Sequence, residues 1–195
     1  LEETIGWTQS LAATAHSATA KAVPIFVDCI SSNNPNISFS DLKAKYSRKT
    51  KAVIVVHFAG YATDDIYDIK EFCTSKNIYL LEDVAHAPLA KFKDNAMAGT
   101  VGHFSCFSFF SNKNIPAGEG GMLCSAEHDV IDRARKLKSH GMSVQTQDRY
   151  KKSALLYDVV EPGFNYRMPE LSCGIALSQA KKYLKELIDN RIEGY

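Results

Sequence analysis

Several features that the sequence lacks exclude whole classes of protein and of binding site. It has no apolar run near the ~20 residues that a membrane-spanning helix needs, and none typical of a signal peptide. It has no Cys-X-X-Cys or Cys/His spacing, so no metal site is expected. A net charge of +1 gives no excess of one sign to attract nucleic acid or an anionic membrane. We therefore expect a cytoplasmic protein with neither of those partners.

Cysteine is also too sparse and irregular for a disulfide framework. The five cysteines are widely spaced and odd in number. Because most stand in apolar runs, we expect buried thiols in a reducing compartment. They are Cys29, Cys73, Cys106, Cys124 and Cys173.

What is present is an alternation of short β-branched or aromatic runs with amphipathic ones, which predicts an α/β fold with a mostly parallel sheet. A length of 195 residues favours one domain. Three local signals are specific: a polar turn over residues 33–36, a helix cap at Ser40, and Gly141 at the C′ position of a helix. The expected strands are 24–28, 51–58, 78–82, 103–109 and 122–124, and the expected helices are 40–46, 66–75, 127–139 and 169–192.

Two features concern the extent of the chain. The polar stretch 142–160 has no clear period and predicts a long loop, and loops of this length are often functional. The chain starts at Leu1 without a methionine and ends at Tyr195, directly after a helical run. We therefore expect a fragment that is truncated at both ends.

The chemistry starts with Asp83 and Lys113. Asp83 closes an apolar strand, and Lys113 follows the next strand in the run Ser111-Asn112-Lys113. Ligands of open α/β sheets bind at the carboxyl ends of the strands. A lysine that forms a Schiff base, facing an aspartate that holds a pyridinium nitrogen, is what pyridoxal phosphate chemistry requires. The alternatives are a surface lysine and an aspartate that caps a helix.

Other polar residues can complete such a site. His86 follows Asp83 by three residues, although a histidine there is more often structural. The hydroxyl of Ser108, together with the backbone N–H groups of residues 118–121, suits a phosphate, but this turn matches no nucleotide-binding motif. The segment 163–168 offers Asn165 and Arg167 as anion contacts, and packing of a helix-entry loop is an equal alternative.

Taken together, these segments resemble the DegT/StrS-type sugar aminotransferases, a branch of the fold type I pyridoxal phosphate enzymes. No single motif is decisive, but their order and spacing are specific and span about residues 13–191. The matching segments are 23–28, 49–54, 57–60, 82–87, 108–114, 119–121, 139–142 and 163–168.

The resemblance implies a role for individual residues. Lys113 matches the lysine that binds the cofactor covalently and carries a proton, and Asp83 matches the partner of the pyridine nitrogen. His86 matches the position that contacts the 3-hydroxyl of the ring, and Ser108 a phosphate-binding hydroxyl. Asn165 matches an amide that reaches the cofactor of the neighbouring subunit, which implies a homodimer with shared active sites.

The resemblance also implies missing parts. The phosphate-cradling segment should precede Leu1, and the C-terminal small domain should follow the last helix. Residues 1–195 would then be the core of a three-layer large domain. The ring that stacks on the cofactor should come from residues 7–11, where Trp7 is a candidate and Leu11 aligns equally well.

The expected function is therefore an aminotransferase that uses glutamate or glutamine to aminate a nucleotide-linked keto-sugar. Sugar dehydratases of the same superfamily carry histidine in place of the lysine, so Lys113 favours transamination. A regulatory, non-catalytic relative is the second alternative, and an α/β domain with another ligand is the third. The sugar, the carbon that is aminated and the donor are not encoded in these motifs.

Overall fold

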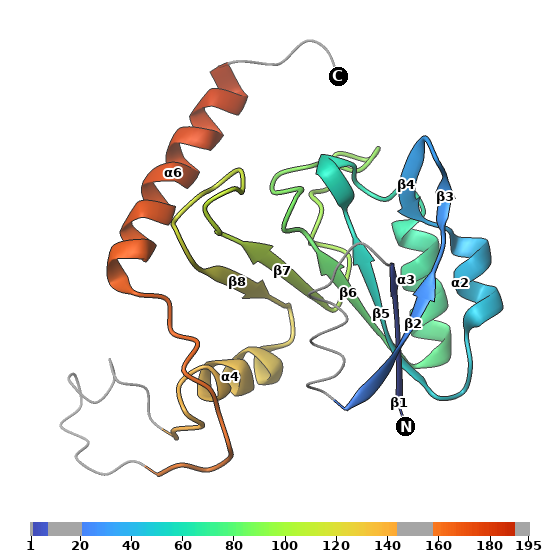
Figure 1. Cartoon of the computed structure of the whole chain (residues 1–195), viewed down its shortest axis with the longest axis horizontal. Helices are drawn as coiled ribbons and strands as arrows, with labels where there is room; N and C mark the ends of the chain where they lie inside the picture. Colours follow the sequence, from blue (N-terminus) through green and yellow to red (C-terminus); the bar gives the residue numbers. More distant parts are fainter. Residues whose placement is uncertain (1, 8–20, 144–157, 190–195) are drawn as a thin grey trace.

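The computed structural model describes residues 2–7, 21–143 and 158–189, with only the backbone for 2–7 and 186–189. Six strands form one mixed sheet in the order β2-β1-β5-β6-β7-β8 (Figure 1). Only β8 runs antiparallel to its neighbour. The strands are β1 (Glu2–Trp7), β2 (Ala22–Val27), β5 (Thr50–Val56), β6 (Tyr79–Asp83), β7 (Phe104–Ser108) and β8 (Gly121–Cys124).

A small second sheet and several helices complete the described fold. β3 (Cys29–Ser31) and β4 (Asn34–Ile37) form a hairpin. The helices are α2 (Phe39–Lys45), the 3-10 turn η1 (Phe58–Gly60), α3 (Ile66–Lys76), α4 (His128–Leu137) and α6 (Glu170–Asp189).

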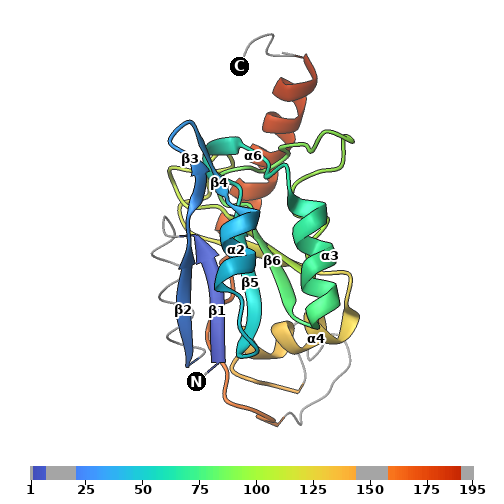
Figure 2. The ribbon, with the colours of Figure 1, turned by 90° about the vertical axis from the view of Figure 1, so that its right-hand side faces the viewer.

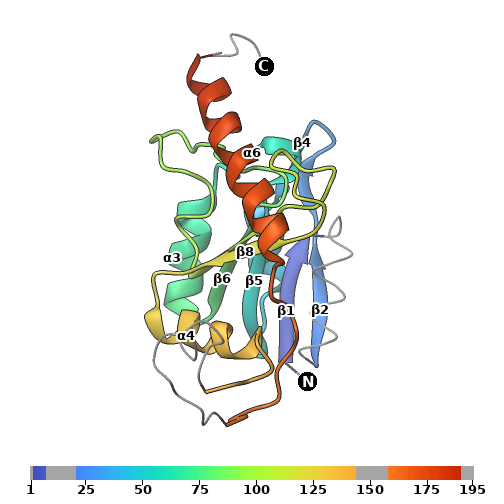
Figure 3. The same cartoon turned by 90° about the vertical axis from the view of Figure 1, so that its left-hand side faces the viewer.

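The helices lie on both sides of the sheet. Seen from one side, α2 and α3 stand in front of the strands (Figure 2), and from the opposite side α6 does (Figure 3). The mixed, mostly parallel sheet with helices on two sides confirms the predicted three-layer α/β architecture.

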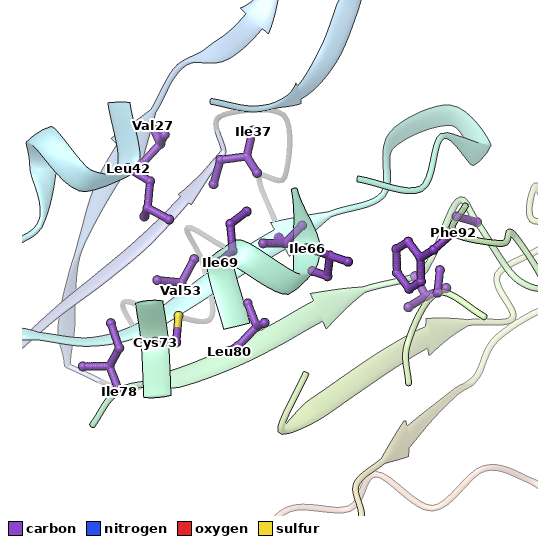
Figure 4. Close-up of a cluster of buried hydrophobic side chains, with 14 residues drawn as sticks. Val27, Ile37, Leu42, Val53, Ile66, Ile69, Cys73, Ile78, Leu80 and Phe92 are labelled. Atoms are coloured by element: carbon purple, nitrogen blue, oxygen red, sulfur yellow. The ribbon is translucent and has the colours of Figure 1, made fainter. Parts of the chain in front are cut away.

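The core lies between α2, α3 and the sheet (Figure 4). The α3 residues Ile66, Ile69 and Cys73 recur at helical spacing and are fully buried against Val53 and Leu80 of the sheet. At roughly 25 cal/mol per Å² of buried apolar surface, such contacts are the main favourable term of folding.

Three local predictions are wrong in detail. Helix α2 is capped by Ser38 rather than Ser40, because the Ser38 hydroxyl accepts a hydrogen bond from Asp41 N at 3.3 Å. The predicted turn over 33–36 lies at residues 32–33, and residues 34–36 belong to β4.

Gly141 also has a different role from the one predicted. Helix α4 ends at Leu137 with Lys138 as its cap, so Gly141 stands beyond the C′ position. Gly141 has a φ of +70°, and a Cβ there would lie 1.7 Å from the carbonyl oxygen of Glu161. The close approach of two backbones, rather than the helix end, therefore requires this glycine.

The prediction that most cysteines are buried is wrong as well. Cys73 is buried, but Cys29 and Cys124 are half-buried, and Cys106 and Cys173 are exposed. On β7, Cys106 alternates with Ser105 and Phe107, so it faces away from the core, and Cys173 lies on an exposed part of α6. In α6, Ala176 is buried, whereas Leu171, Ile175, Leu177 and Leu184 are exposed. Among the described residues, no helix is long and apolar enough to cross a membrane.

Candidate active site

Asp83 is the last residue of β6, at the carboxyl edge of the parallel strands. Its backbone aligns with Val56 of β5 and Cys106 of β7. The half-buried carboxylate accepts a hydrogen bond from Ala85 N at 3.0 Å through Oδ1. Oδ2 makes no hydrogen bond with any residue that the structure describes. Asp83 thus forms a turn of its own rather than capping a helix, and keeps one oxygen free for a ligand.

Lys113 lies in the loop between β7 and β8, at the same edge. Its backbone N–H donates to Phe110 O at 2.9 Å in a tight turn. Phe109 holds both sides of the loop, donating to Gly120 O at 2.9 Å and accepting from Ala117 N at 2.8 Å. The lysine is half-buried, and within the described chain its Nζ has no hydrogen bond or ion pair. Adjacent strands therefore bring the predicted amine and carboxylate to one edge.

Two further predicted residues lie at this edge. Ser108 ends β7, and its Oγ accepts a hydrogen bond from Phe110 N at 3.3 Å. His86 is exposed after β6, and its ring lies 5.6 Å from the ring of Phe58 between centroids. Four of the six predicted site residues therefore lie at the carboxyl edge of the sheet: Asp83, Lys113, Ser108 and His86.

Asn165 lies at the opposite edge. Its backbone pairs with Ser139, just after α4, and its neighbour Tyr166 donates to Lys138 O at 2.9 Å. Helix α4 follows β8, which ends beside the start of β7, so this region lies at the amino edge of the parallel strands (Figure 1). The backbone of Asn165 is therefore held beside the segment after α4, and among the described residues no interaction joins Asn165 to Asp83 or Lys113.

The remaining predicted residue is the stacking ring. Trp7 ends β1, and its backbone aligns with Val27. The Trp7 side chain, like the alternative Leu11, lies outside the described residues, so its stacking role stays a prediction.

Sequence reasoning missed a buried polar pair directly behind the edge. Glu82 and His57 are both fully buried, and His57 Nε2 lies 2.9 Å from Glu82 Oε2. Burial alone raises the pKa of Glu82, but hydrogen bonds from His57, Gly102 and Gly99 outweigh it, so the pKa is lowered overall. The available signal was a carboxylate within an apolar strand, since buried charges need partners.

Cys106 is the immediate neighbour of Asp83 in the sheet. Desolvation of its thiol is the largest effect, and together with the charges of Asp83 and Cys124 it raises the pKa of Cys106 to about 11. At neutral pH the thiol is therefore protonated and adds no negative charge beside Asp83.

The fold and site define a class. Pyridoxal phosphate needs an amine, a partner for its ring nitrogen and a contact for its phosphate. The carboxyl edge of the sheet offers all three: a half-buried lysine, a carboxylate with a free oxygen and a serine hydroxyl. The residues present therefore fit this cofactor. These groups stand where open α/β sheets bind their ligands, at the carboxyl ends of the strands.

The chain belongs to the DegT/DnrJ/EryC1/StrS aminotransferase family, whose model matches residues 2–195. Aminotransferases of this family depend on pyridoxal phosphate. Family membership thus agrees with the donor set found at the sheet edge.

Individual relatives and one solved structure support the assignment. The chain is 38% identical over 163 residues to the GDP-perosamine synthase of Escherichia coli O157:H7, covering 83% of this chain and 41% of that protein. It is 36% identical over 162 residues to the spore coat polysaccharide biosynthesis protein SpsC of Bacillus subtilis, with coverages of 83% and 41%.

The crystal structure of the aminotransferase TlmJ from Streptoalloteichus hindustanus superposes with a TM-score of 0.82 at 30% identity. That match covers 93% of this chain and 46% of TlmJ. The chain thus spans less than half the length of these relatives.

Proposed function

We propose that this protein is a pyridoxal phosphate-dependent aminotransferase that transfers an amino group from glutamate or glutamine to a nucleotide-linked keto-sugar. The placement of Lys113 and Asp83 on adjacent strand exits at one sheet edge carries the proposal. The similarity to a GDP-perosamine synthase supports the substrate class, and the similarity to SpsC supports a role in polysaccharide biosynthesis.

Each residue at the edge then has a task. Lys113 holds the cofactor and moves a proton through Nζ. Asp83 keeps the ring nitrogen protonated through its free oxygen, and Ser108 anchors the phosphate. His86 contacts the 3-hydroxyl of the ring. When bound, the cofactor supplies the electron sink that makes the Cα–H bond of an amino acid acidic.

The overall reaction balances without an external oxidant or reductant. The donor amino acid loses its amino group and becomes a 2-oxo acid, and the keto-sugar exchanges its carbonyl oxygen for that amino group. The long loop expected over residues 142–160 lies mostly outside the described residues, so its contribution to sugar specificity remains a prediction. We further propose that residues 1–195 form the core of the large, cofactor-binding domain.

The decisive experiment compares Lys113→Ala with Lys93→Ala in the protein at its natural length. Lys93 is an exposed lysine paired with Asp64 at 3.2 Å, and serves as the matched control. We expect a yellow protein that converts glutamate or glutamine to the 2-oxo acid, with this conversion lost in Lys113→Ala only. Full retention of transfer in Lys113→Ala, or a protein that stays colourless with added pyridoxal phosphate, would reject the proposal.

Asn165 suggests a separate proposal about assembly. Because it lies at the amino edge of its own sheet, we propose that it reaches the cofactor of a second subunit in a homodimer. Mixing the Lys113→Ala and Asn165→Ala variants, with subunit exchange, would then create one site with both residues intact. Activity of the mixture above that of either variant alone is expected. No gain in exchanged heterodimers would show that both residues serve the same subunit's site.

A further inference from the structure

His57 and Glu82 form a buried polar pair whose protonation state follows from its hydrogen bonds. Thr63 N donates to His57 Nδ1 at 3.1 Å, and a backbone N–H can only donate. Nδ1 is therefore unprotonated, so the proton of the neutral imidazole is on Nε2. His57 Nε2–H then donates to Glu82 Oε2 across 2.9 Å. The ring is thus fixed from both sides.

Glu82 also accepts hydrogen bonds from the loop that precedes β7. Its Oε2 accepts a hydrogen bond from Gly99 N at 2.8 Å, and its Oε1 accepts from Val101 N at 2.8 Å and from Gly102 N. The buried carboxylate is compensated by these donors and His57, and among the described residues no cationic side chain pairs with it. One side chain thus ties together β6, the end of β5 and the entry to β7.

The same histidine is bonded to the candidate cofactor ligand. The backbone N–H of His57 donates to the carbonyl oxygen of Asp83 at 3.0 Å. His57 therefore bonds Glu82 through its ring and Asp83 through its backbone. Glu82 and Asp83 are consecutive residues of β6, so their side chains point to opposite faces of the sheet. The His57–Glu82 pair therefore lies on one face and the Asp83 carboxylate on the other.

We propose that His57 is a positioning residue. It holds the Asp83 carboxylate in the place and orientation that a bond to the cofactor's ring nitrogen requires. The inference rests on the proposed function, because it takes Asp83 as the partner of that nitrogen. His57 is fully buried, so its ring is not accessible to a substrate. Its effect passes through Glu82 and the backbone of Asp83. The ring must be neutral, because a proton on Nδ1 would break the hydrogen bond from Thr63 N.

The test measures the affinity for pyridoxal phosphate, by absorbance titration of the protein at its natural length. His57→Leu keeps the backbone bond to Asp83 but removes the ring donor and acceptor. We expect its dissociation constant for the cofactor to rise by roughly tenfold or more, since small displacements of ligating groups are costly. His57→Gln can still donate to Glu82, so most of the affinity should return.

Ile69→Ala is the matched control, because Ile69 is equally buried in the α3 core but contacts neither strand exit by a hydrogen bond. Comparison is made at temperatures where the folded fractions are equal. An affinity loss as large in Ile69→Ala as in His57→Leu, or wild-type affinity in His57→Leu, would overturn the positioning role. If His57→Leu does not fold, His57→Phe takes its place, because it keeps a ring against Phe92 but also lacks the donor and the acceptor. The same loss of affinity is expected for it, and wild-type affinity in His57→Phe would overturn the positioning role. Failure of the unaltered protein to bind pyridoxal phosphate would instead reject the proposed function.

Discussion

The side chain of Met168 lies directly against Gly120, the residue that ends the loop carrying Lys113. A Cβ on Gly120 would lie 2.6 Å from Met168 Cε and 2.7 Å from its Sδ. A second contact joins the same regions, because Asn114 Nδ2 donates to Tyr183 Oη of α6 at 3.3 Å. The segment before α6 and the helix itself thus hold the loop on which the candidate lysine lies.

Replacing this glycine should disturb the loop. Gly120 has a φ of +144°, which L residues rarely adopt, so Gly120→Ala should lower the free energy of unfolding by about 1–3 kcal/mol. Urea denaturation measures this loss. In a Met168→Ala background the part due to the contact should disappear, leaving only the backbone strain. Equal losses of unfolding free energy in both backgrounds would show that the contact with Met168 does not contribute to the effect of Gly120→Ala.

Replacing Asp83 tests its role at the ring nitrogen. Asp83→Asn keeps the shape but cannot hold a proton on the cofactor, so the rate of amino transfer should fall by about a hundredfold. The turn at Ala85 should survive, because an amide oxygen can accept the same hydrogen bond. Steady-state kinetics with saturating cofactor measures the fall, with Asp68→Asn on the exposed side of α3 as the control. A rate within a factor of about two of wild type would contradict the assignment.

The buried carboxylate should make stability depend on pH in acid. The pKa of Glu82 is lower in the folded protein than its ordinary value of 4.5. Its contribution is therefore fully present above pH 4.5 and is lost as the pH falls through the folded pKa. Urea midpoints between neutral and acidic pH should decline less steeply in Glu82→Gln than in wild type. The exposed Glu119→Gln should behave like wild type, and identical slopes for all three proteins would contradict the prediction.

Thiol labelling should separate the cysteines by environment. Burial raises the pKa of Cys73 to about 12, so this thiol should label only on unfolding. Cys106 is exposed as a residue, but its pKa of about 11 should slow labelling by about a hundredfold relative to an ordinary thiol. The exposed Cys173 should react first. Mass spectrometry after timed alkylation measures the order, and early modification of Cys73 would contradict the burial.

The sequence allowed much of the site to be predicted because its signals are local. An apolar strand that ends in Asp83 and another that runs into Lys113 indicate a shared edge, since parallel strands place their carboxyl ends together. Helix α3 followed from Ile66, Ile69 and Cys73 at helical spacing. Strand β1 was not predicted, and its pairing between β2 and β5 depends on contacts distant in sequence.

Residue order alone thus determined the fold class, the strand exits and the resemblance to sugar aminotransferases, because periodicity and motif spacing are properties of the chain itself. Only the tertiary structure decided that Asn165 lies at the opposite edge from Asp83. It alone joined His57 to Glu82, twenty-five residues apart, in a buried pair of a neutral imidazole and a carboxylate. The physical reason is that hydrogen bonds between strands depend on register and burial, which no local pattern specifies.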